Sequence, residues 1–303
     1  QSYLNSLETA LEALERDKFR KTDYDEAIAG RTGIDCFDHW CDELKETGYL
    51  HNHARMWFGS IWIFTLRLPW ELGADFFLNH LIDGDAAANT LSWRWVGGLH
   101  TKGKSYLARP SNIAQFTDGR FDPVGQLSPT AEPLIEDMDH PYVPLSLVQP
   151  IPQDEYVLLM TSEDCQPESF TTGAQIGVLG LLSATDPKQS TQVRAFEKGA
   201  VQDAISRSSQ TLATVATTQD WGAALIEAAQ KAGTNQIITP WAAIGPIATQ
   251  LDATKAELEK AGIHLHQQQR TYDPLTWPHA TKGFFKLKKK IPNILNDLGF
   301  IDV

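Results

Sequence analysis

The sequence has few cysteines and no long apolar run, and both shortages limit the classes of protein that it can belong to. Its three cysteines, Cys36, Cys41 and Cys165, are an odd number and form no C-x-x-C pair. We therefore expect neither a disulfide framework nor a four-cysteine zinc or iron–sulfur site. No apolar run reaches the roughly 18 residues of a membrane helix, and no signal-peptide pattern is present. These absences predict a cytoplasmic protein that does not enter a membrane.

An excess of positive charge is also missing. The formal net charge of −12 argues against nucleic-acid affinity over the whole surface. Local basic segments remain at residues 100–121, where a single acid, Asp118, occurs, and at 282–290, which has five lysines. Each segment is either an ordinary solvated surface or a binding patch. The sequence also has no G-x-G-x-x-G and no P-loop motif, so neither type of nucleotide site is indicated.

The spacing of apolar residues changes along the chain and predicts two domains. Residues 1–122 have helical spacing, with one helix ending at Gly48 and an apolar, buried helix over 50–68. Residues 123–154 are rich in proline and predict a linker or an extended wrap across a surface. In 155–303 short apolar runs alternate with helical patterns, which is typical of a parallel sheet in a Rossmann-like α/β domain. The expected strands are 156–162, 176–183, 212–218, 236–241 and 263–268, and the expected helices are 191–208, 220–233 and 247–262.

The stretch "LIDGDAAANTLSWRW", residues 81–95, gathers carboxylates, an amide and indoles. Asp83 and Asp85 flank Gly84, where we expect a helix to break beside free backbone amides. Asn89 and Trp93 are four residues apart and share a helix face. One interpretation is a cofactor pocket. The other is a helix N-cap at Asp85 followed by indoles of the core.

An arginine in the apolar helix upstream favours the pocket. Arg55 needs a carboxylate partner if it is buried, because an unpaired buried charge costs about 3–5 kcal/mol. Asp83 is the partner that we expect. Carboxylates, amides, an arginine and indoles together suit a planar heteroaromatic cofactor. A metal is not expected, because His51 and His53, in an H-x-H pattern on a helix, should point to different sides.

Three segments resemble the FAD-binding helical domain of DNA photolyases and cryptochromes. They are "TGIDCFDHWCDELKETGYLHNHARM", "LIDGDAAANTLSWRW" and "YLARPSNI" with "GRFDP", and the similarity runs from Arg31 to Pro123. The resemblance implies a partial, all-helical FAD-binding bundle. FAD is therefore the expected cofactor.

The resemblance also implies which residues bind the cofactor: Asn52, Arg55, Phe77, Asp83, Asp85 and Asn89. Arg55 and Asp83 match the ion pair beside the isoalloxazine ring. Asp85 matches the carboxylate near N3 and O2 of the ring, and Asn89 the residue that faces N5. Phe77 falls at a position that packs on the ring.

Two tryptophans match the family's electron-transfer chain. Trp93 corresponds to its proximal member and Trp70 to its middle member, so the resemblance makes both catalytic together with Asn89. The third, surface tryptophan has no counterpart, because the region near residue 17 offers only Phe19 and Tyr24. Either Tyr24 is the terminal donor, or the chain has none.

A further set of residues matches contacts to damaged DNA. Met56 and Trp95 correspond to residues that touch a flipped-out pyrimidine dimer, Asn52 lies near the lesion as well as the adenine, and Arg109 matches a phosphate contact. Enzymes specific for (6-4) lesions have histidines at the Asn52 and Met56 positions. The resemblance therefore implies a deoxyribodipyrimidine photo-lyase that splits cyclobutane dimers. A cryptochrome-like photoreceptor and a scaffold without flavin remain as alternatives.

The order of the domains departs from the family. Photolyases have an α/β antenna domain before the helical one, whereas here an α/β domain follows, and its residues 255–292 weakly resemble the end of the antenna domain. No residue identifies an antenna pigment. The family's FAD-phosphate loop has no counterpart in the sequence, so we expect an upstream segment or a second chain to complete the FAD domain.

Overall fold

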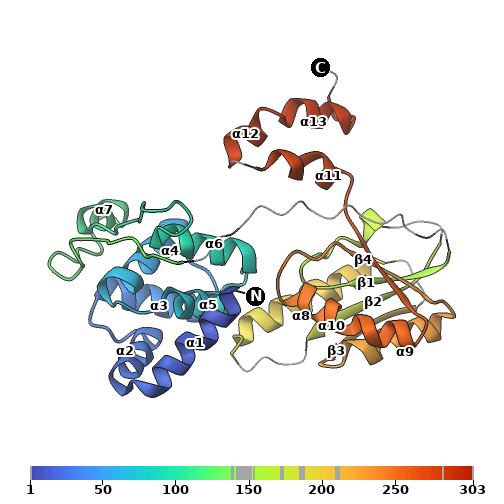
Figure 1. Cartoon of the computed structure of the whole chain (residues 1–303), viewed down its shortest axis with the longest axis horizontal. Helices are drawn as coiled ribbons and strands as arrows, with labels where there is room; N and C mark the ends of the chain where they lie inside the picture. The colour runs from blue at the N-terminus through green and yellow to red at the C-terminus, as the bar shows by residue number, and fades with distance from the viewer. Residues whose placement is uncertain are drawn as a thin grey trace. The chain divides into compact units, whose positions relative to one another are not determined.

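The computed structural model describes residues 2–137, 140, 152, 154–170, 174–183, 188–208, 212–281 and 283–301. The chain forms two compact units, one of residues 1–139 with 185–196 and the other of residues 140–184 with 197–303. The first is helical and the second contains the sheet (Figure 1). The boundaries expected at 122/123 and 154/155 stay predictions.

Caps that are visible in the sequence separate the helices of the first unit. Asp17 accepts from the backbone amides of Phe19 and Arg20, and so ends one helix and starts the next. Gly30 and Gly48 adopt left-handed φ angles of 70° and 69° and end their helices, as expected for Gly48. The helices are α1 Ser2–Arg16, α2 Lys18–Ala29, α3 Asp35–Thr47, α4 Asn52–Ser60, α5 Trp70–His80, α6 Ala86–Gly97 and α7 Pro110–Phe116.

The helix expected over 50–68 is shorter and less regular than predicted. After α4 the chain continues as one π-helical segment, η1, Ile61–Thr65. It then leaves the helix at Leu66, and Arg67 has a φ of 55°. The following Pro69 disfavours helical backbone at the residue before it, which explains the stop. Similarly, α5 ends at His80 instead of continuing toward Gly84.

Aromatic side chains fill the core of the first unit. Phe37 and Phe58 stack with ring centroids 4.1 Å apart, and Trp62 lies beside both. Part of the proline-rich segment packs on this core, since Leu134 is half-buried against it and its amide donates to Gly97. Residues 127–134 of this segment therefore pack along the core of the helical unit.

The second unit is built on a five-stranded parallel sheet, as predicted, and the three expected helices are present. The strands are β1 Tyr156–Met160, β2 Gln175–Ser183, β3 Leu212–Thr218, β4 Gln236–Pro240 and β5 His264–Gln268. The helices are α8 Thr191–Arg207, whose start up to residue 196 is assigned to the first unit, α9 Trp221–Ala232 and α10 Pro246–Lys260. The strand order is β3-β2-β1-β4-β5, the Rossmann type. Alternate residues of β1 belong to two separate apolar clusters, so side chains cover both faces of the sheet.

Short helices follow the sheet: α11 Tyr272–Thr276, a 3-10 turn η3 Trp277–His279, α12 Phe284–Lys288 and α13 Ile291–Asp297. A second 3-10 turn, η2 Pro167–Phe170, lies between β1 and β2. Among the described helices, none has the length and apolar character needed to cross a bilayer.

Candidate functional site

The ion pair predicted between Arg55 and Asp83 is present. Nη2 of Arg55, on α4, donates to both carboxylate oxygens of Asp83, at 3.0 and 2.9 Å. Its Nε donates to the carbonyl of Leu50 at 2.7 Å, and the guanidinium lies 5.4 Å from the ring centroid of Tyr49. Arg55 is half-buried rather than fully buried: its side chain is 26 % exposed, and that of Asp83 is 55 % exposed. Three contacts thus hold a charged group at the surface.

Asp85 and Asn89 are both anchored to backbone. Asp85 is the N-cap of α6, and one carboxylate oxygen accepts from the amide of Ala88 at 2.6 Å. Asn89 donates its side-chain N–H to the carbonyl of Ala74, on α5, at 2.8 Å. The amide oxygen of Asn89 and the second oxygen of Asp85 are therefore the atoms that can accept hydrogen bonds from a ligand.

The solvent-exposed face of α6 has small side chains next to these polar groups. Ala87, Ala88 and Ser92 are exposed on it, and Leu91 is half-exposed. Small side chains allow a planar group to approach a helix closely, and the carboxylates of Asp83 and Asp85 lie just before the start of this helix.

Three aromatic residues expected at the cofactor or in electron transfer are buried: Trp70, Phe77 and Trp93. Trp93 contacts Phe77 at 5.1 Å between ring centroids, and Trp62 at 6.1 Å. Trp70 instead contacts Tyr3, at 5.6 Å. Within the described residues no ring contact joins Trp93 directly to Trp70.

Sequence reasoning missed Trp62 and Tyr3 as neighbours of these tryptophans. Trp62 is in the apolar stretch expected as a buried helix, so nothing in the local pattern distinguishes it from a core residue. Tyr24, one of the two alternatives left open for the terminal donor, contacts Trp62 at 6.0 Å. The sequence pattern does not indicate this contact, because Tyr24 and Trp62 are on different helical segments that meet only in the folded chain.

Two of the residues expected at DNA lie next to polar or aromatic partners. Trp95 is 38 % exposed and stacks on Tyr106, with ring centroids 5.5 Å apart. The sulfur of Met56 accepts from the side chain of Asn52 at 3.6 Å. Each pair places an apolar surface beside solvent on the helical unit.

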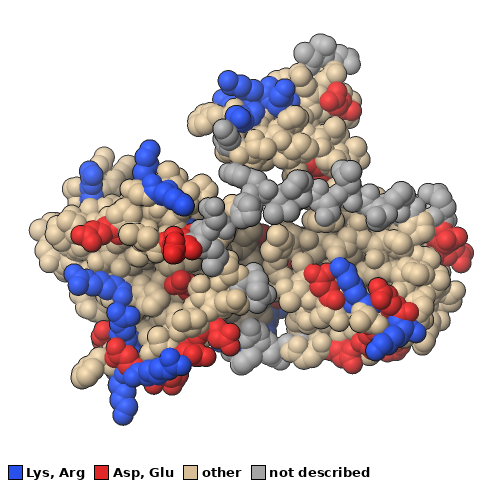
Figure 2. All heavy atoms as spheres, viewed as in Figure 1, with Lys and Arg blue, Asp and Glu red and all other residues tan. Residues whose placement is uncertain are grey.

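Arg109 is exposed at the rim of a pocket of about 480 Å³. Two hydrogen bonds fix this region to α4: Ala108 donates its amide to the hydroxyl of Ser60 at 2.8 Å, and Trp57 donates to Asn112 at 3.0 Å. In Figure 2 the Lys and Arg side chains at the upper edge of this unit lie over α7 and the loop before it. The other polar residues around the pocket are Ser105, Tyr106, Ser111, Asn112 and Gln115.

The prediction that the rings of His51 and His53 point to different sides is wrong. His51 is the N-cap of α4 and not part of the helix, and its Nδ1 accepts from the amide of His53 at 3.2 Å. The two rings therefore meet edge to face, 5.3 Å apart, instead of pointing to different sides. The described part of the chain contains no group of three or more His, Cys, Asp or Glu side chains arranged to hold a metal.

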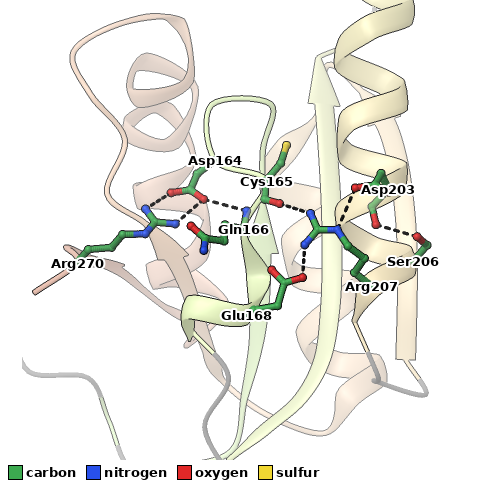
Figure 3. A network of polar contacts seen from close by, with 8 residues as sticks. All are labelled: Asp164, Cys165, Gln166, Glu168, Asp203, Ser206, Arg207 and Arg270. Carbon is green, nitrogen blue, oxygen red and sulfur yellow. Dashed lines mark hydrogen bonds and ion pairs between the residues drawn. The ribbon is translucent and has the colours of Figure 1, made fainter. Parts of the chain in front are cut away.

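The second unit contains a separate polar network (Figure 3). Arg270, after β5, makes a two-pronged ion pair with Asp164, after β1. Arg207, at the end of α8, binds Glu168, Asp203 and the carbonyl of Cys165. The charged groups of the network pair with one another, so these contacts hold the β1–β2 connection against the end of α8 and the segment after β5.

Comparison with known proteins supports the resemblance of the helical unit. Residues 3–153 match the family model described as the FAD binding domain of DNA photolyase. The chain is 42 % identical to a deoxyribodipyrimidine photo-lyase of Streptomyces griseus over 114 residues, 36 % of this chain and 24 % of that protein. The corresponding enzyme of Vibrio cholerae is 31 % identical over 114 residues, 38 % of this chain and 24 % of that protein. Cryptochrome-1 of Arabidopsis thaliana is 34 % identical over 97 residues, 32 % of this chain and 14 % of that protein.

Through its helical region the chain belongs to the photolyase/cryptochrome family. The aligned segment spans about a quarter of the length of the curated photolyases that it matches. No match to a solved structure was found.

Proposed function

We propose that the chain binds FAD on the surface formed by α4 and the start of α6, and repairs cyclobutane pyrimidine dimers in DNA with the energy of light. The Arg55–Asp83 pair carries this proposal. It is fixed at the surface beside Asp85 and Asn89, inside the segment that matches the FAD-binding family.

The polar groups on this surface fit the edge of a flavin. The ring presents carbonyl acceptors and an N–H donor, and here a guanidinium, carboxylates and an amide oxygen lie next to exposed alanines. When bound and reduced, FAD supplies the electron that splits the dimer. This match between donors and acceptors supports FAD as the cofactor.

The chain's own residues have distinct tasks in this proposal. Arg55 stabilises negative charge on the bound ring, and Asp83 with Leu50 keeps its guanidinium in place. Asn89, held by Ala74, would offer its amide oxygen as a hydrogen-bond acceptor to an N–H of the flavin ring. Both side chains are positioned by backbone or ionic contacts before a ligand arrives, which lowers the cost of binding.

DNA binding is assigned to the surface around Trp95 and Arg109. The stacked pair of Trp95 and Tyr106 offers a flat apolar surface to an extruded base. Arg109 contacts a phosphate, with exposed Lys102 and Lys104 nearby in the sequence. Affinity for DNA should therefore fall as salt rises.

A retention experiment tests the cofactor site. The full chain is mixed with FAD and separated from free FAD by gel filtration, and the flavin that stays with the protein is measured by its absorbance. The wild-type chain should retain FAD and Asp85→Ala should lose it. Asp23→Ala, an exposed carboxylate on α2, is the control and should behave as wild type. Equal retention by Asp85→Ala and wild type would contradict the site.

A light-dependent assay tests repair. DNA containing cyclobutane dimers is incubated with the FAD-loaded chain in blue light or in the dark, and intact pyrimidines are counted. Repair only in the light supports a photolyase. The similarity to cryptochrome-1 favours a photoreceptor as the second candidate; it predicts light-driven reduction of the flavin with no repair. If the chain retains no FAD, the remaining hypothesis is a scaffold that does not bind flavin.

A further inference from the structure

We propose that Trp93, Trp62 and Tyr24 form an electron-transfer branch in which Tyr24 is the terminal donor. This inference rests on the proposed flavin chemistry, and it goes further by assigning a relay to Trp62 and a route to Tyr24. The family's pattern, which points from Trp93 to Trp70, indicates neither.

The rings of this branch form a continuous series. The centroids of Trp93 and Trp62 are 6.1 Å apart with planes at 84°, and those of Trp62 and Tyr24 are 6.0 Å apart at 88°. Trp62 is completely buried, whereas Tyr24, on α2, is half-buried and reaches solvent. Electron transfer weakens steeply with the gap between donor and acceptor, so short ring-to-ring steps from the core to the surface favour this route.

The environment of Trp62 also suits a transient positive charge. Its indole N–H donates to the carbonyl of Pro69 at 2.9 Å, and this contact strengthens when the indole loses an electron. Trp70, by contrast, has the guanidinium of Arg94 5.8 Å from its ring centroid. A cation so close opposes a second positive charge, although the pairing of Arg94 with Glu136 weakens the effect.

The charges balance at each step. After Trp93 has given one electron to a photoexcited, oxidised flavin, Trp62 gives one electron to Trp93, and Tyr24 gives one to Trp62. Tyr24 releases its O–H proton to water and becomes a neutral tyrosyl radical, while both indoles return to their original state. Burial, followed by the charges of Asp75 and Asp25, raises the pKa of Tyr24 to about 12. The phenol is therefore protonated at neutral pH, and the electron and the proton leave together.

Two phenylalanine variants and a matched control test the branch in the FAD-loaded chain. Tyr24→Phe and Trp62→Phe should each slow photoreduction of the flavin by about tenfold or more. Tyr3→Phe removes the phenol that contacts Trp70 and should change the rate by less than about twofold. The reverse order, with Tyr3→Phe slow and Tyr24→Phe unchanged, would overturn the proposal in favour of Trp70.

A second measurement needs no flavin and separates this inference from the proposed function. Azide radicals oxidise tryptophans in the flavin-free full chain, and the tyrosyl radical that follows is recorded by transient absorption and electron paramagnetic resonance. The wild-type signal should fall at least about threefold in Tyr24→Phe and stay unchanged in Tyr3→Phe. An equal signal in wild type and Tyr24→Phe would refute the branch even if the chain binds FAD. If Trp62→Phe does not fold, Tyr24→Phe alone carries both measurements.

Discussion

Gly73 and Trp93 are packed so closely that only glycine fits at position 73. A Cβ atom placed there would lie 2.3 Å from Cη2 of Trp93 and 3.0 Å from Cε2 of Trp62. The missing side chain on α5 is therefore what lets the two indoles approach one another. Any residue other than glycine would have to move one of two fully packed rings.

Gly73→Ala should destabilise the helical unit by about 1–3 kcal/mol, because an added methyl group overpacks this core. Urea unfolding followed by tryptophan fluorescence measures the change. Gly59→Ala is the matched control, since a Cβ there lies 3.7 Å from both Trp93 and Val96, an ordinary contact. That variant should gain about 0.5–1 kcal/mol from the higher helix propensity of alanine. Equal stability of the two variants would contradict the packing argument.

Ser60→Ala should cost about 1–3 kcal/mol of stability, because it leaves the buried amide of Ala108 without its hydrogen-bond acceptor. The same change should loosen the backbone next to Arg109 and weaken DNA binding. Unfolding curves and DNA-binding isotherms measure the two effects. Thr9→Ala removes an exposed hydroxyl of α1 and is the control, with little expected change in either. A normal stability for Ser60→Ala would show that this hydrogen bond is replaced.

Acid should destabilise the protein below about pH 6.5 through His80. Burial lowers the pKa of His80 below its ordinary value of 6.5, while its Nδ1 lies 2.8 Å from the carbonyl of Phe76. The unfolded chain therefore binds a proton at a higher pH than the folded chain. The stability conferred by neutral His80 is present above the unfolded pKa and is lost as the pH falls toward the folded one. Burial lowers the pKa of His266 as well, so it acts in the same direction.

His80→Gln should flatten part of this loss, as measured by the urea midpoint across a series of pH values. His100→Gln, at an exposed position, is the control and should retain the wild-type profile. An unchanged slope in His80→Gln would assign the acid sensitivity elsewhere.

The thiols should differ in reactivity. Burial raises the pKa of Cys36 to about 12 and that of Cys41 to about 11, so both are protonated and inaccessible near neutral pH. Cys165 is only half-buried, although burial raises its pKa too. A thiol reagent should therefore modify Cys165 slowly in the native protein, and all three cysteines after unfolding. Rapid modification of more than one thiol in the native chain would contradict the burial of Cys36 and Cys41.

Apolar spacing was sufficient to predict the five strands and the three helices between them, because each follows a local periodicity and their alternation is typical of a parallel sheet. It did not predict the π-helical turn at Ile61–Thr65, where the packing of Trp62 and the stop before Pro69 outweigh local preference. The direction of the His51 ring was also predicted wrongly from the H-x-H pattern. His51 is the N-cap of α4 and has non-helical backbone, so its side chain does not follow the helical spacing.

In the candidate site, too, local sequence patterns predicted some features and missed others. The Arg55–Asp83 pair followed from a carboxylate-rich motif and an arginine in an apolar helix. Its exposure did not, because neither residue type reveals how open the surrounding surface is. The contact of Tyr24 with Trp62 joins separate helical segments, and no spacing along the chain indicates it.

Arg55→Lys should separate a ligand-binding role of the ion pair from a structural one. Lysine keeps the positive charge but loses the planar fork, which here binds Asp83 and the carbonyl of Leu50 together. An ion pair as exposed as this one contributes about 0–1 kcal/mol, so the stability of the variant should remain close to that of wild type. If the guanidinium orients the flavin, FAD affinity should nevertheless fall by about tenfold, as measured by titration of flavin fluorescence. Arg16→Lys, in an exposed pair on α1, controls for the chemical change itself. Loss of stability with unchanged FAD affinity would make the Arg55–Asp83 pair a structural contact and remove the main support for the flavin site.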